Sequence, residues 1–355
     1  MNKRRLVLQR TTQAAALTLF SAAAPGGLAQ PGSPPQGAGA AATTGPAGAA
    51  GQGAATGKTL RILVGFPPGG GTDVIARLLG DRLREELGQN IVVENRPGAG
   101  GQLAAQALKS SPPDGTTFFL SHDHTITILP LVTKNPGFNP AVDFVPVAGF
   151  ASFVNAFAVS AATPATNFAE YVRWVQAQSE RKERGSVGIP APASTLEFLV
   201  GVMRERFKLD VVAAPYRGSA PMIGDMLGNQ IPAGMGSVPD FVENHKAGKL
   251  RVLAVLGGKR QPALPEVPTF AELGLQGLED PPFYGFFAVA GTPRAATERF
   301  SSALARVLGQ PQVLAQLGQM GLSVEPMTGE QLGRRERAYA QVWTRIVRES
   351  GFTPQ

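Results

Sequence analysis

The chain has 355 residues, of which 43% are hydrophobic, so it can bury one large core or two ordinary ones. It contains no cysteine, which excludes a disulfide framework, a thiolate metal site and an anchor attached to a lipid-modified cysteine. The formal net charge of +7 is weak evidence for nucleic-acid binding, because basic and acidic residues alternate in stretches such as 76–88, as they do on solvated helix faces.

The first 29 residues are predicted to be a signal peptide. Four basic residues precede an apolar run at 14–24, and the small residues Gly27-Leu28-Ala29 offer a cleavage site. The run is too short to span roughly 30 Å of hydrocarbon as a helix, which disfavours a permanent anchor. We expect a mature chain that begins near Gln30 and is soluble in the periplasm, with a net charge of +3 after four of the 33 Lys and Arg residues are removed. Arg4-Arg5 suggests the twin-arginine route, but residues 3–9 only approximate that signal, so the route stays open.

Residues 30–57 are almost entirely Gly, Ala, Pro, Gln, Ser and Thr and predict a disordered leader. After it, apolar runs of strand length alternate with segments of helical periodicity. Strands are expected at 60–66, 90–96 and 116–121, and helices at 72–88 and 102–111. This alternation predicts βαβ units and a parallel sheet.

The α/β pattern restarts after about residue 155. Strands are expected at 157–160, 211–216, 250–257 and 283–290, and helices at 167–178, 195–207, 220–230, 296–309 and 334–350, with a Gly- and Pro-rich turn before residue 195. We predict an α/β fold with two lobes whose cleft lies between two mainly parallel sheets. Lobe 1 comprises residues 58–155 and 283–355, because the last helices are expected to return to it, and lobe 2 comprises residues 156–282.

Two glycine-rich junctions, Pro67–Asp73 and Pro97–Gly101, each join a strand to a helix. Glycines let backbone N–H groups approach a ligand, and the helix N-terminus favours an anion. Neither junction has the Gly-Lys-Ser/Thr ending of a P-loop, and the first lacks dinucleotide spacing, so a nucleotide is disfavoured. The alternative is that both are tight turns in which Thr72 or Asp73 is an N-cap.

His122, Asp123 and His124 follow the strand at 116–121, and strand alternation would place both imidazoles on one side and Asp123 on the other. Two histidines without a third nearby ligand give a weak metal signal, so we expect a polar loop that contacts ligand, with no metal and no cofactor. No Gly-x-Ser-x-Gly elbow is present, and Ser219 is interpreted as an N-cap that could also face the cleft. No catalytic residue is therefore predicted.

Six ordered segments resemble the tripartite tricarboxylate transporter receptors, also called Bug proteins. They are GFPPGGGTDVIARLL at 65–79, IVVENRPGAGG at 91–101, APYRGSAPM at 214–222, HKAGKLRVLAV at 245–255, RQPALPEVPTFAELG at 260–274 and GTP at 291–293. The resemblance covers the chain from about Leu60 onward. It implies a two-lobed periplasmic binding-protein fold and small carboxylate ligands held mainly by loop amides, hydroxyls and water.

By motif match, that role falls on the loop at 66–73 and on residues 217–220. Two other loops depart from the family pattern. Residues 121–125 (SHDHT) replace a small polar loop, and residues 188–195 (GIPAPAST) contain prolines that lack amide hydrogens, with Glu197 at a position where the family has histidine. The predicted ligand-binding residues are Phe66, Pro68, Gly70, Gly71, Thr72, Asp73, His122, Asp123, Ser194, Thr195, Arg217, Gly218, Ser219 and Ala220.

These features predict a non-enzymatic, monomeric receptor that captures a small carboxylate and delivers it to integral membrane transporter subunits, without binding nucleic acid. A periplasmic sensor that presents its bound form to a signalling partner needs the same cleft and remains the alternative. The sequence leaves the ligand's identity open.

Overall fold

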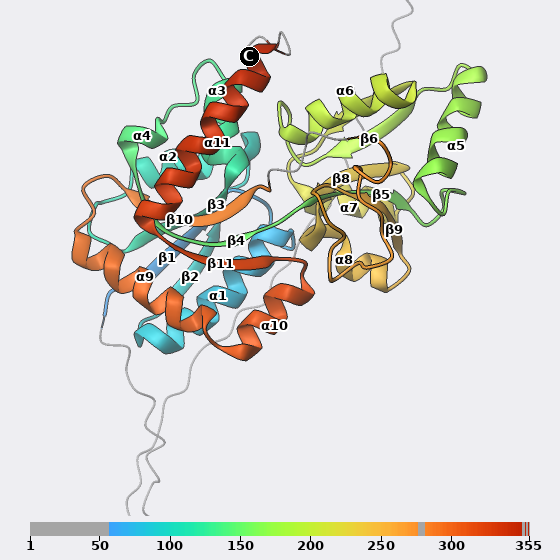
Figure 1. Cartoon of the computed structure of the whole chain (residues 1–355). Coiled ribbons are helices and arrows are strands. Elements are labelled where there is room, and N and C mark those ends of the chain that lie inside the picture. The colour runs from blue at the N-terminus through green and yellow to red at the C-terminus, as the bar shows by residue number, and fades with distance from the viewer. Residues whose placement is uncertain (1–56, 276–280, 350–351, 353, 355) are drawn as a thin grey trace, which may run out of the picture. The chain divides into compact units, whose positions relative to one another are not determined.

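Two β-sheets organise the computed structural model of the chain, which describes residues 57–275 and 281–349 together with Phe352 and Pro354 (Figure 1). Both sheets belong to one compact unit. The predicted signal peptide, the cleavage site near Gln30 and the predicted leader up to residue 56 lie outside the described residues.

Sheet A has six strands in the order β11-β4-β10-β3-β1-β2. Their bounds are β1 Leu60–Val64, β2 Ile91–Asn95, β3 Thr117–His122, β4 Phe144–Ser152, β10 Phe283–Val289 and β11 Ser323–Thr328. Strand β1 pairs in parallel with β2 and β3, whereas β10 pairs antiparallel with β3 and β4, and β11 with β4.

Helices cover both faces of sheet A (Figure 1). One face packs against α1 (Gly71–Leu87), α9 (Arg294–Leu308) and α10 (Pro311–Gln319). The other packs against α2 (Gln102–Lys109), η2 (His124–Ile128), α3 (Leu129–Val132) and α11 (Gly329–Glu349). The short helices η1 (Ala99–Gly101) and α4 (Pro140–Asp143) precede α2 and β4 in the chain. Strand alternation explains the two cores, because Ile62 and Val64 of β1 join the first and Leu63 joins the second. Helix α1 packs on the sheet through a buried face that includes Ile75, and the buried residues of the helix recur at helical spacing.

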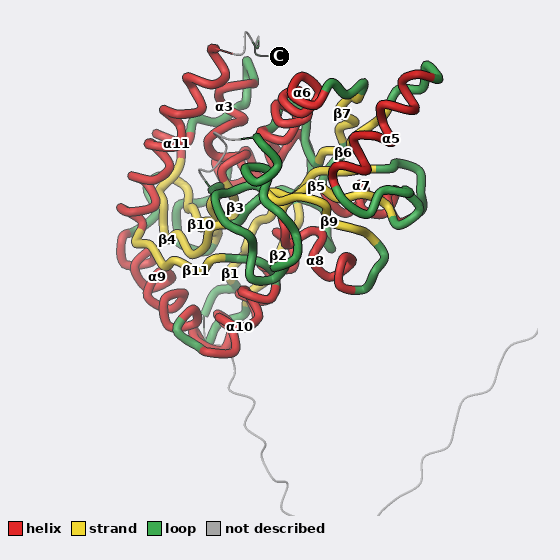
Figure 2. The backbone as a smooth tube through the Cα atoms, turned by 45° about the vertical axis from the view of Figure 1, so that its right-hand side comes forward, coloured by secondary structure: helices red, strands yellow, loops and turns green. Residues whose placement is uncertain are grey.

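Sheet B has five strands in the order β7-β6-β8-β5-β9. The strands are β5 Asn155–Ser160, β6 Gly185–Ile189, β7 Val211–Pro215, β8 Ala233–Ser237 and β9 Leu250–Val255, and the helices are α5 Phe168–Glu180, α6 Thr195–Phe207, α7 Ser219–Leu227 and α8 Val238–Lys246. Helices α5 and α6 share one apolar core with the sheet, and α7 and α8 share another. Figure 2 shows the strands flanked by helices.

The predicted α/β class with two lobes is confirmed, but the sheets are mixed rather than mainly parallel. In sheet B, β6 pairs in parallel with β7 and β8, whereas β5 pairs antiparallel with β8 and β9. The chain passes from sheet A to sheet B between β4 and β5 and returns between β9 and β10. The exact lobe boundaries at 155–156 and 282–283 remain a prediction.

Two strands of sheet B were not predicted. Strand β6 lies in the segment interpreted as a Gly- and Pro-rich turn, and β8 has the sequence AGMGS. Their glycines leave room for packing: a Cβ at Gly188 would lie 2.8 Å from the Met222 side chain and one at Gly234 would lie 2.6 Å from that of Met226. Small residues are therefore needed where α7 packs on the sheet, and they hide the strand signal.

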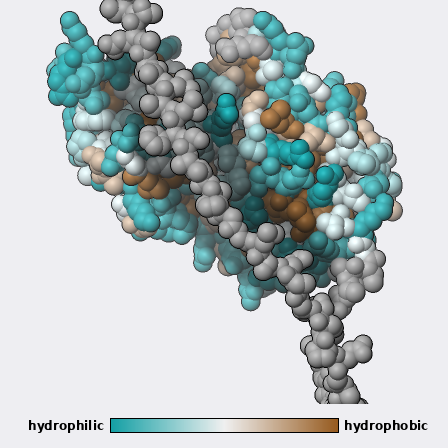
Figure 3. Space-filling view, turned by 180° about the vertical axis from the view of Figure 1, so that it is seen from behind, coloured by the Kyte–Doolittle hydropathy of each residue, from teal (hydrophilic) through white to brown (hydrophobic). Residues whose placement is uncertain are grey.

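The face in Figure 3 carries mainly hydrophilic side chains with scattered hydrophobic ones. The large apolar side chains that are exposed come from separate elements, for example Val74 in α1, Val142 in α4 and Leu227 in α7. None of the described helices has the length and apolar character needed to cross a membrane.

Candidate functional site

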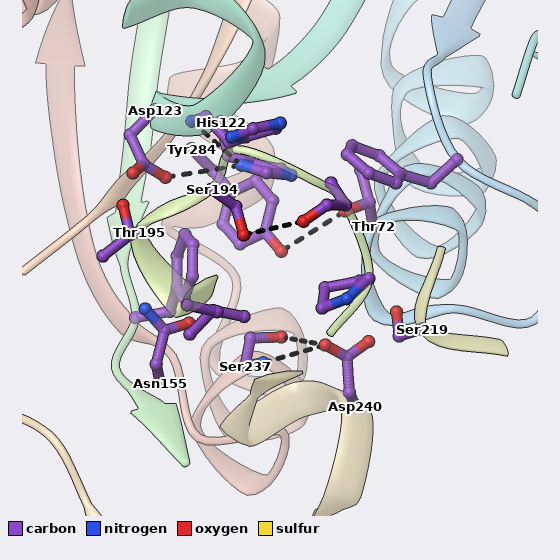
Figure 4. A pocket seen from close by; sticks show the side chains of 16 residues that line it. Thr72, His122, Asp123, Asn155, Ser194, Thr195, Ser219, Ser237, Asp240 and Tyr284 are labelled. Carbon is purple, nitrogen blue, oxygen red and sulfur yellow. Dashed lines mark hydrogen bonds and ion pairs between the residues drawn. The ribbon is translucent and has the colours of Figure 1, made fainter. Parts of the chain in front are cut away.

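A cavity of about 60 Å³ lies where strand ends of sheet A face those of sheet B (Figure 4). A site of this size suits a small ligand. Its lining comes from seven segments: Phe66 and Thr72; His122, Asp123 and His124; Phe153 and Asn155; Pro190, Ala191, Ser194, Thr195 and Leu196; Ser219; Ser237 and Asp240; and Tyr284.

Half of the predicted site residues line this cavity: Phe66, Thr72, His122, Asp123, Ser194, Thr195 and Ser219. The structure places the other predicted residues outside the lining: Pro68, Gly70, Gly71, Asp73, Arg217, Gly218 and Ala220. Asn155, Ser237, Asp240 and Tyr284 were missed. Ser237 and Asp240 could have been found from the end of β8, had that strand been recognised. Tyr284 lies inside the apolar strand β10, where its sequence pattern indicates only a core residue.

The N-terminus of α1 already binds a carboxylate. Its N-cap is Gly70, in extended conformation and without a side-chain cap, so neither Thr72 nor Asp73 is the N-cap that the sequence suggested. The Gly71 N–H donates to Asp240 Oδ1 at 3.0 Å, which joins α1 to the first turn of α8. A Cβ at Gly70 would lie 3.2 Å from Ser219 Oγ, so α1 and α7 begin close together. Two helix N-termini therefore lie close together, and the N-terminus of a helix favours an anion.

Asp73 does not line the cavity, and its carboxylate holds the loop that precedes α1. The Gly69 N–H donates to Asp73 Oδ2 at 2.9 Å, Arg77 Nε donates to the same oxygen at 3.0 Å, and Asn95 Nδ2 donates to Oδ1 at 2.8 Å. Burial opposes ionisation of Asp73, but these hydrogen bonds outweigh it and lower the pKa of the carboxyl group. Asn95 also donates to the Phe66 carbonyl oxygen at 3.0 Å, so the loop is held at both ends.

Asp240 belongs to a capping box at the start of α8. Its Oδ2 accepts hydrogen bonds from the Ser237 N–H at 2.9 Å and from Ser237 Oγ at 2.7 Å. Because Oδ1 accepts the Gly71 N–H, the carboxylate accepts three hydrogen bonds in all.

Thr72 and Tyr284 meet on the sheet A side, where Thr72 Oγ1 and Tyr284 Oη lie 3.4 Å apart. Burial raises the pKa of the Tyr284 phenol well above its usual range, and the nearby Asp240 carboxylate adds to this effect. The phenol therefore keeps its proton and can donate a hydrogen bond to a ligand oxygen.

His122, Asp123 and His124 all line the cavity, so the predicted alternation of sides is wrong here. The chain leaves the extended conformation at Asp123, whose φ of −45° and ψ of −43° are helical, and continues into η2. The His122 ring stacks on Phe66 at a centroid distance of 5.0 Å. Asp123 Oδ2 accepts a hydrogen bond from Tyr339 Oη of α11 at 3.1 Å.

His124 is 7% exposed, and both of its ring nitrogens are buried without a hydrogen-bond partner in the described part of the chain. The pKa of His124 is lowered to about 4, mainly by burial. The neighbouring His122 lowers the pKa as well, and this effect is larger than the opposite effect of Asp123. The ring is therefore uncharged at neutral pH.

The loop before α6 contributes hydroxyls and few amides. Ser194 is the N-cap of α6, and its Oγ donates to the Ala191 carbonyl oxygen at 2.8 Å. Thr195 Oγ1 is buried and, among the described residues, has no hydrogen-bond partner. Glu197, at the family's histidine position, is outside the lining and accepts the Ala193 N–H at 2.6 Å.

The predicted residues at the start of α7 divide between two positions. Ser219 is the first helical residue and lines the cavity, while Gly218 is the N-cap, so the interpretation of Ser219 as N-cap is wrong. Arg217 is exposed and lies outside the lining. The lining contains no Lys or Arg, and the described residues include no group of three His, Asp or Glu side chains suited to hold a metal ion.

Residues 75–352 match the sequence model of the tripartite tricarboxylate transporter family receptor. Three solved structures are similar. The periplasmic binding protein BugD is 27% identical, with a TM-score of 0.78 over 84% of this chain and 99% of that one. An R. palustris protein solved with adipate is 29% identical, with a TM-score of 0.78 over 84% and 98%. MatC from Rhodopseudomonas palustris, solved with bound malate, is 26% identical, with a TM-score of 0.73 over 81% and 98%. With this match and these two sheets around one polar cavity, the chain belongs to the tripartite tricarboxylate transporter receptor family of periplasmic solute-binding proteins.

Proposed function

We propose that this receptor captures a small carboxylate-containing metabolite outside the cytoplasmic membrane and delivers it to a tripartite tricarboxylate-type transporter. The observation that carries the proposal is the hydrogen bond from the Gly71 N–H to the Asp240 carboxylate at the cavity. It supports an anion site there, because a side-chain carboxylate already occupies an amide at a helix N-terminus. The adipate and malate of the two R. palustris structures support the same class of ligand.

In this proposal, a ligand carboxylate lies near the N-termini of α1 and α7. The hydroxyls of Thr72, Ser219 and Tyr284 donate to it, and it replaces Asp240 as acceptor of the Gly71 N–H. Gly70 and Gly71 act by their lack of a side chain, since a Cβ at Gly71 would lie 3.0 Å from Asp240 Oδ1.

The remaining predicted loop residues act as supports. Pro68 and Asp73 shape the loop before α1, and Gly218 and Ala220 start α7 where a Cβ at Gly218 would lie 2.4 Å from Pro67 Cδ. Arg217 does not form an ion pair with the ligand.

We also propose where the protein acts and with which partner. The chain is made with a signal peptide, works as a monomer in the periplasm, binds ligand without turning it over and hands it to membrane transporter subunits. Interleaved charges and the small net charge of the mature chain argue against nucleic acid as a partner.

A thermal-shift screen of small acids tests the ligand class, because a ligand at 100 times its dissociation constant adds about 2.7 kcal/mol to stability. We expect one or more small carboxylates to raise the melting temperature. Stabilisation only by uncharged solutes would contradict the proposal. Co-purification with a membrane permease tests the transport role, and recovery of a sensor kinase in its place would support ligand sensing.

A further inference from the structure

The charges of the cavity lining do not suit a ligand with two carboxylates. Asp123 and Asp240 both line it, no Lys or Arg does, and the other polar groups are hydroxyls, one amide and two imidazoles. His124 does not offset the negative charge at neutral pH, because burial keeps its ring uncharged. A dicarboxylate would bring two more negative charges into a space that these two carboxylates line, where like charges repel.

We propose that the ligand is a zwitterion, a small carboxylate that also carries an ammonium group, and that Asp123 accepts the ammonium. This rests on the proposed function, since the carboxylate of the same ligand binds near the N-termini of α1 and α7. Figure 4 shows Asp123 and Asp240 at opposite ends of the labelled side chains, with Ser194 between them, so the two charged ends of one ligand have separate places.

Asp123 has unused capacity as an acceptor. It is 4% exposed and forms no ion pair with Lys or Arg among the described residues. Its Oδ2 accepts the Tyr339 hydroxyl, and its Oδ1 lies 3.3 Å from His122 Nδ1. The His124 backbone N–H lies 3.3 Å from the same Nδ1, and an Nδ1 that accepts this N–H has no proton to donate to Asp123.

A buried carboxylate left in this state needs a cation, since removing a charge from water costs several kcal/mol unless it is paired. An ammonium group satisfies that need directly. It carries three N–H donors, of which Asp123 takes at least one.

Two further residues of the lining have polar side-chain atoms that lack partners among the described residues. Thr195 Oγ1 is buried and unbonded, and so are both ring nitrogens of His124, on a side chain that is 7% exposed. A hydroxyl and the bare nitrogen of an uncharged imidazole can each accept one N–H. Thr195 and His124 therefore line the same cavity as Asp123 with acceptors that no described residue uses, and an unbonded buried polar group is costly.

Calorimetry with three matched sets of probes tests the proposal. The sets are propionate, β-alanine and succinate; butyrate, γ-aminobutyrate and glutarate; and valerate, δ-aminovalerate and adipate. Within a set, the second compound adds an ammonium to a monocarboxylate and the third replaces that ammonium by a carboxylate. We expect the amino compound to bind about tenfold or more tighter than both of its partners in the set whose length fits the cavity.

The Asp123→Asn variant should lose this tenfold preference and bind the monocarboxylate of the same set within about twofold of the wild type. Asp210→Asn is the matched control. It removes one negative charge from a surface pair with Arg184 outside the cavity, and it should keep the preference. Melting curves of both variants check folding, and if Asp123→Asn does not fold, the wild-type ranking alone decides.

Each outcome has a separate meaning. Tightest binding of a dicarboxylate by the wild type would overturn the zwitterion proposal while leaving the carboxylate receptor intact. An amino preference that persists in Asp123→Asn would overturn the role of Asp123. Absence of binding to every acid in the three sets would count against the proposed function itself.

Discussion

Asp240 occupies the Gly71 N–H that a ligand carboxylate is proposed to use, so it competes with the ligand. The Asp240→Asn variant keeps the shape and one acceptor oxygen but removes the negative charge. We expect it to bind small carboxylates about tenfold tighter, a gain of about 1.4 kcal/mol, when measured by calorimetry. Its melting temperature checks that the cap of α8 survives. Weaker binding would show that the Asp240 carboxylate itself contributes to ligand binding.

His124 makes stability depend on pH. Its pKa is lowered from 6.5 to about 4 in the folded chain, so below pH 6.5 the unfolded chain takes up a proton that the folded chain does not. Stability is therefore lost as pH falls from about 6.5 towards 4. We expect denaturant unfolding to show His124→Leu gaining about 2 kcal/mol relative to wild type between pH 7 and pH 5. A difference between the two proteins that does not change with pH would contradict this account.

At the scale of elements, the two helix N-termini can be tested against an ion pair from Arg217. Gly70 has a φ of −78°, so a side chain there is not strained, but its Cβ would lie 3.2 Å from Ser219 Oγ. We expect Gly70→Val to fold and to abolish binding by filling the space between α1 and α7. Exposed Arg217 should matter less, and Arg217→Ala should cost no more than about 0.5 to 1.5 kcal/mol. Normal binding by the Gly70 variant with loss in the Arg217 variant would replace this model with a direct ion pair.

At the scale of the whole molecule, closure of the two lobes on ligand is expected because residues of the two lobes meet at specific contacts beside the cavity. One is the Gly71 to Asp240 hydrogen bond, and another is Gly218, whose φ is +114° and whose Cβ would lie 2.4 Å from Pro67 Cδ. Small-angle scattering of the wild type should change when the best acid from the screen saturates it. Gly218→Val should prevent that change, whereas Gly248→Val, also at positive φ but with open space around it, should not. A wild-type curve unaffected by ligand would argue for a rigid body.

The N-terminus gives a separate test at this scale. The basic residues, the apolar run and Gly27-Leu28-Ala29 predict a mature chain that begins near Gln30. N-terminal sequencing of exported protein should find that start. Exported protein that still begins at Met1 would contradict the predicted cleavage.

The sequence by itself determined the elements with strong periodicity and the loop before α1. Strand β1, helix α1 and helix α6 lie where they were predicted, because apolar spacing and glycine or proline punctuation are local signals. Strands β6 and β8 were not predicted, because their glycines are needed to make room for the side chains of Met222 and Met226. Only the packing of the folded chain reveals that need. The family was likewise readable from short ordered motifs.

Only the tertiary structure decided which polar groups share the cavity. Asp240 accepts the Gly71 N–H although the two residues are 169 positions apart in the sequence. The hydroxyl of Tyr339 in α11 donates to Asp123, which is 216 positions away. No local pattern encodes such contacts, because they depend on how two sheets and their helices meet. The same holds for Asp73, whose hydrogen bonds from Arg77 and Asn95 only the folded chain reveals, while its contact with ligand stays a prediction.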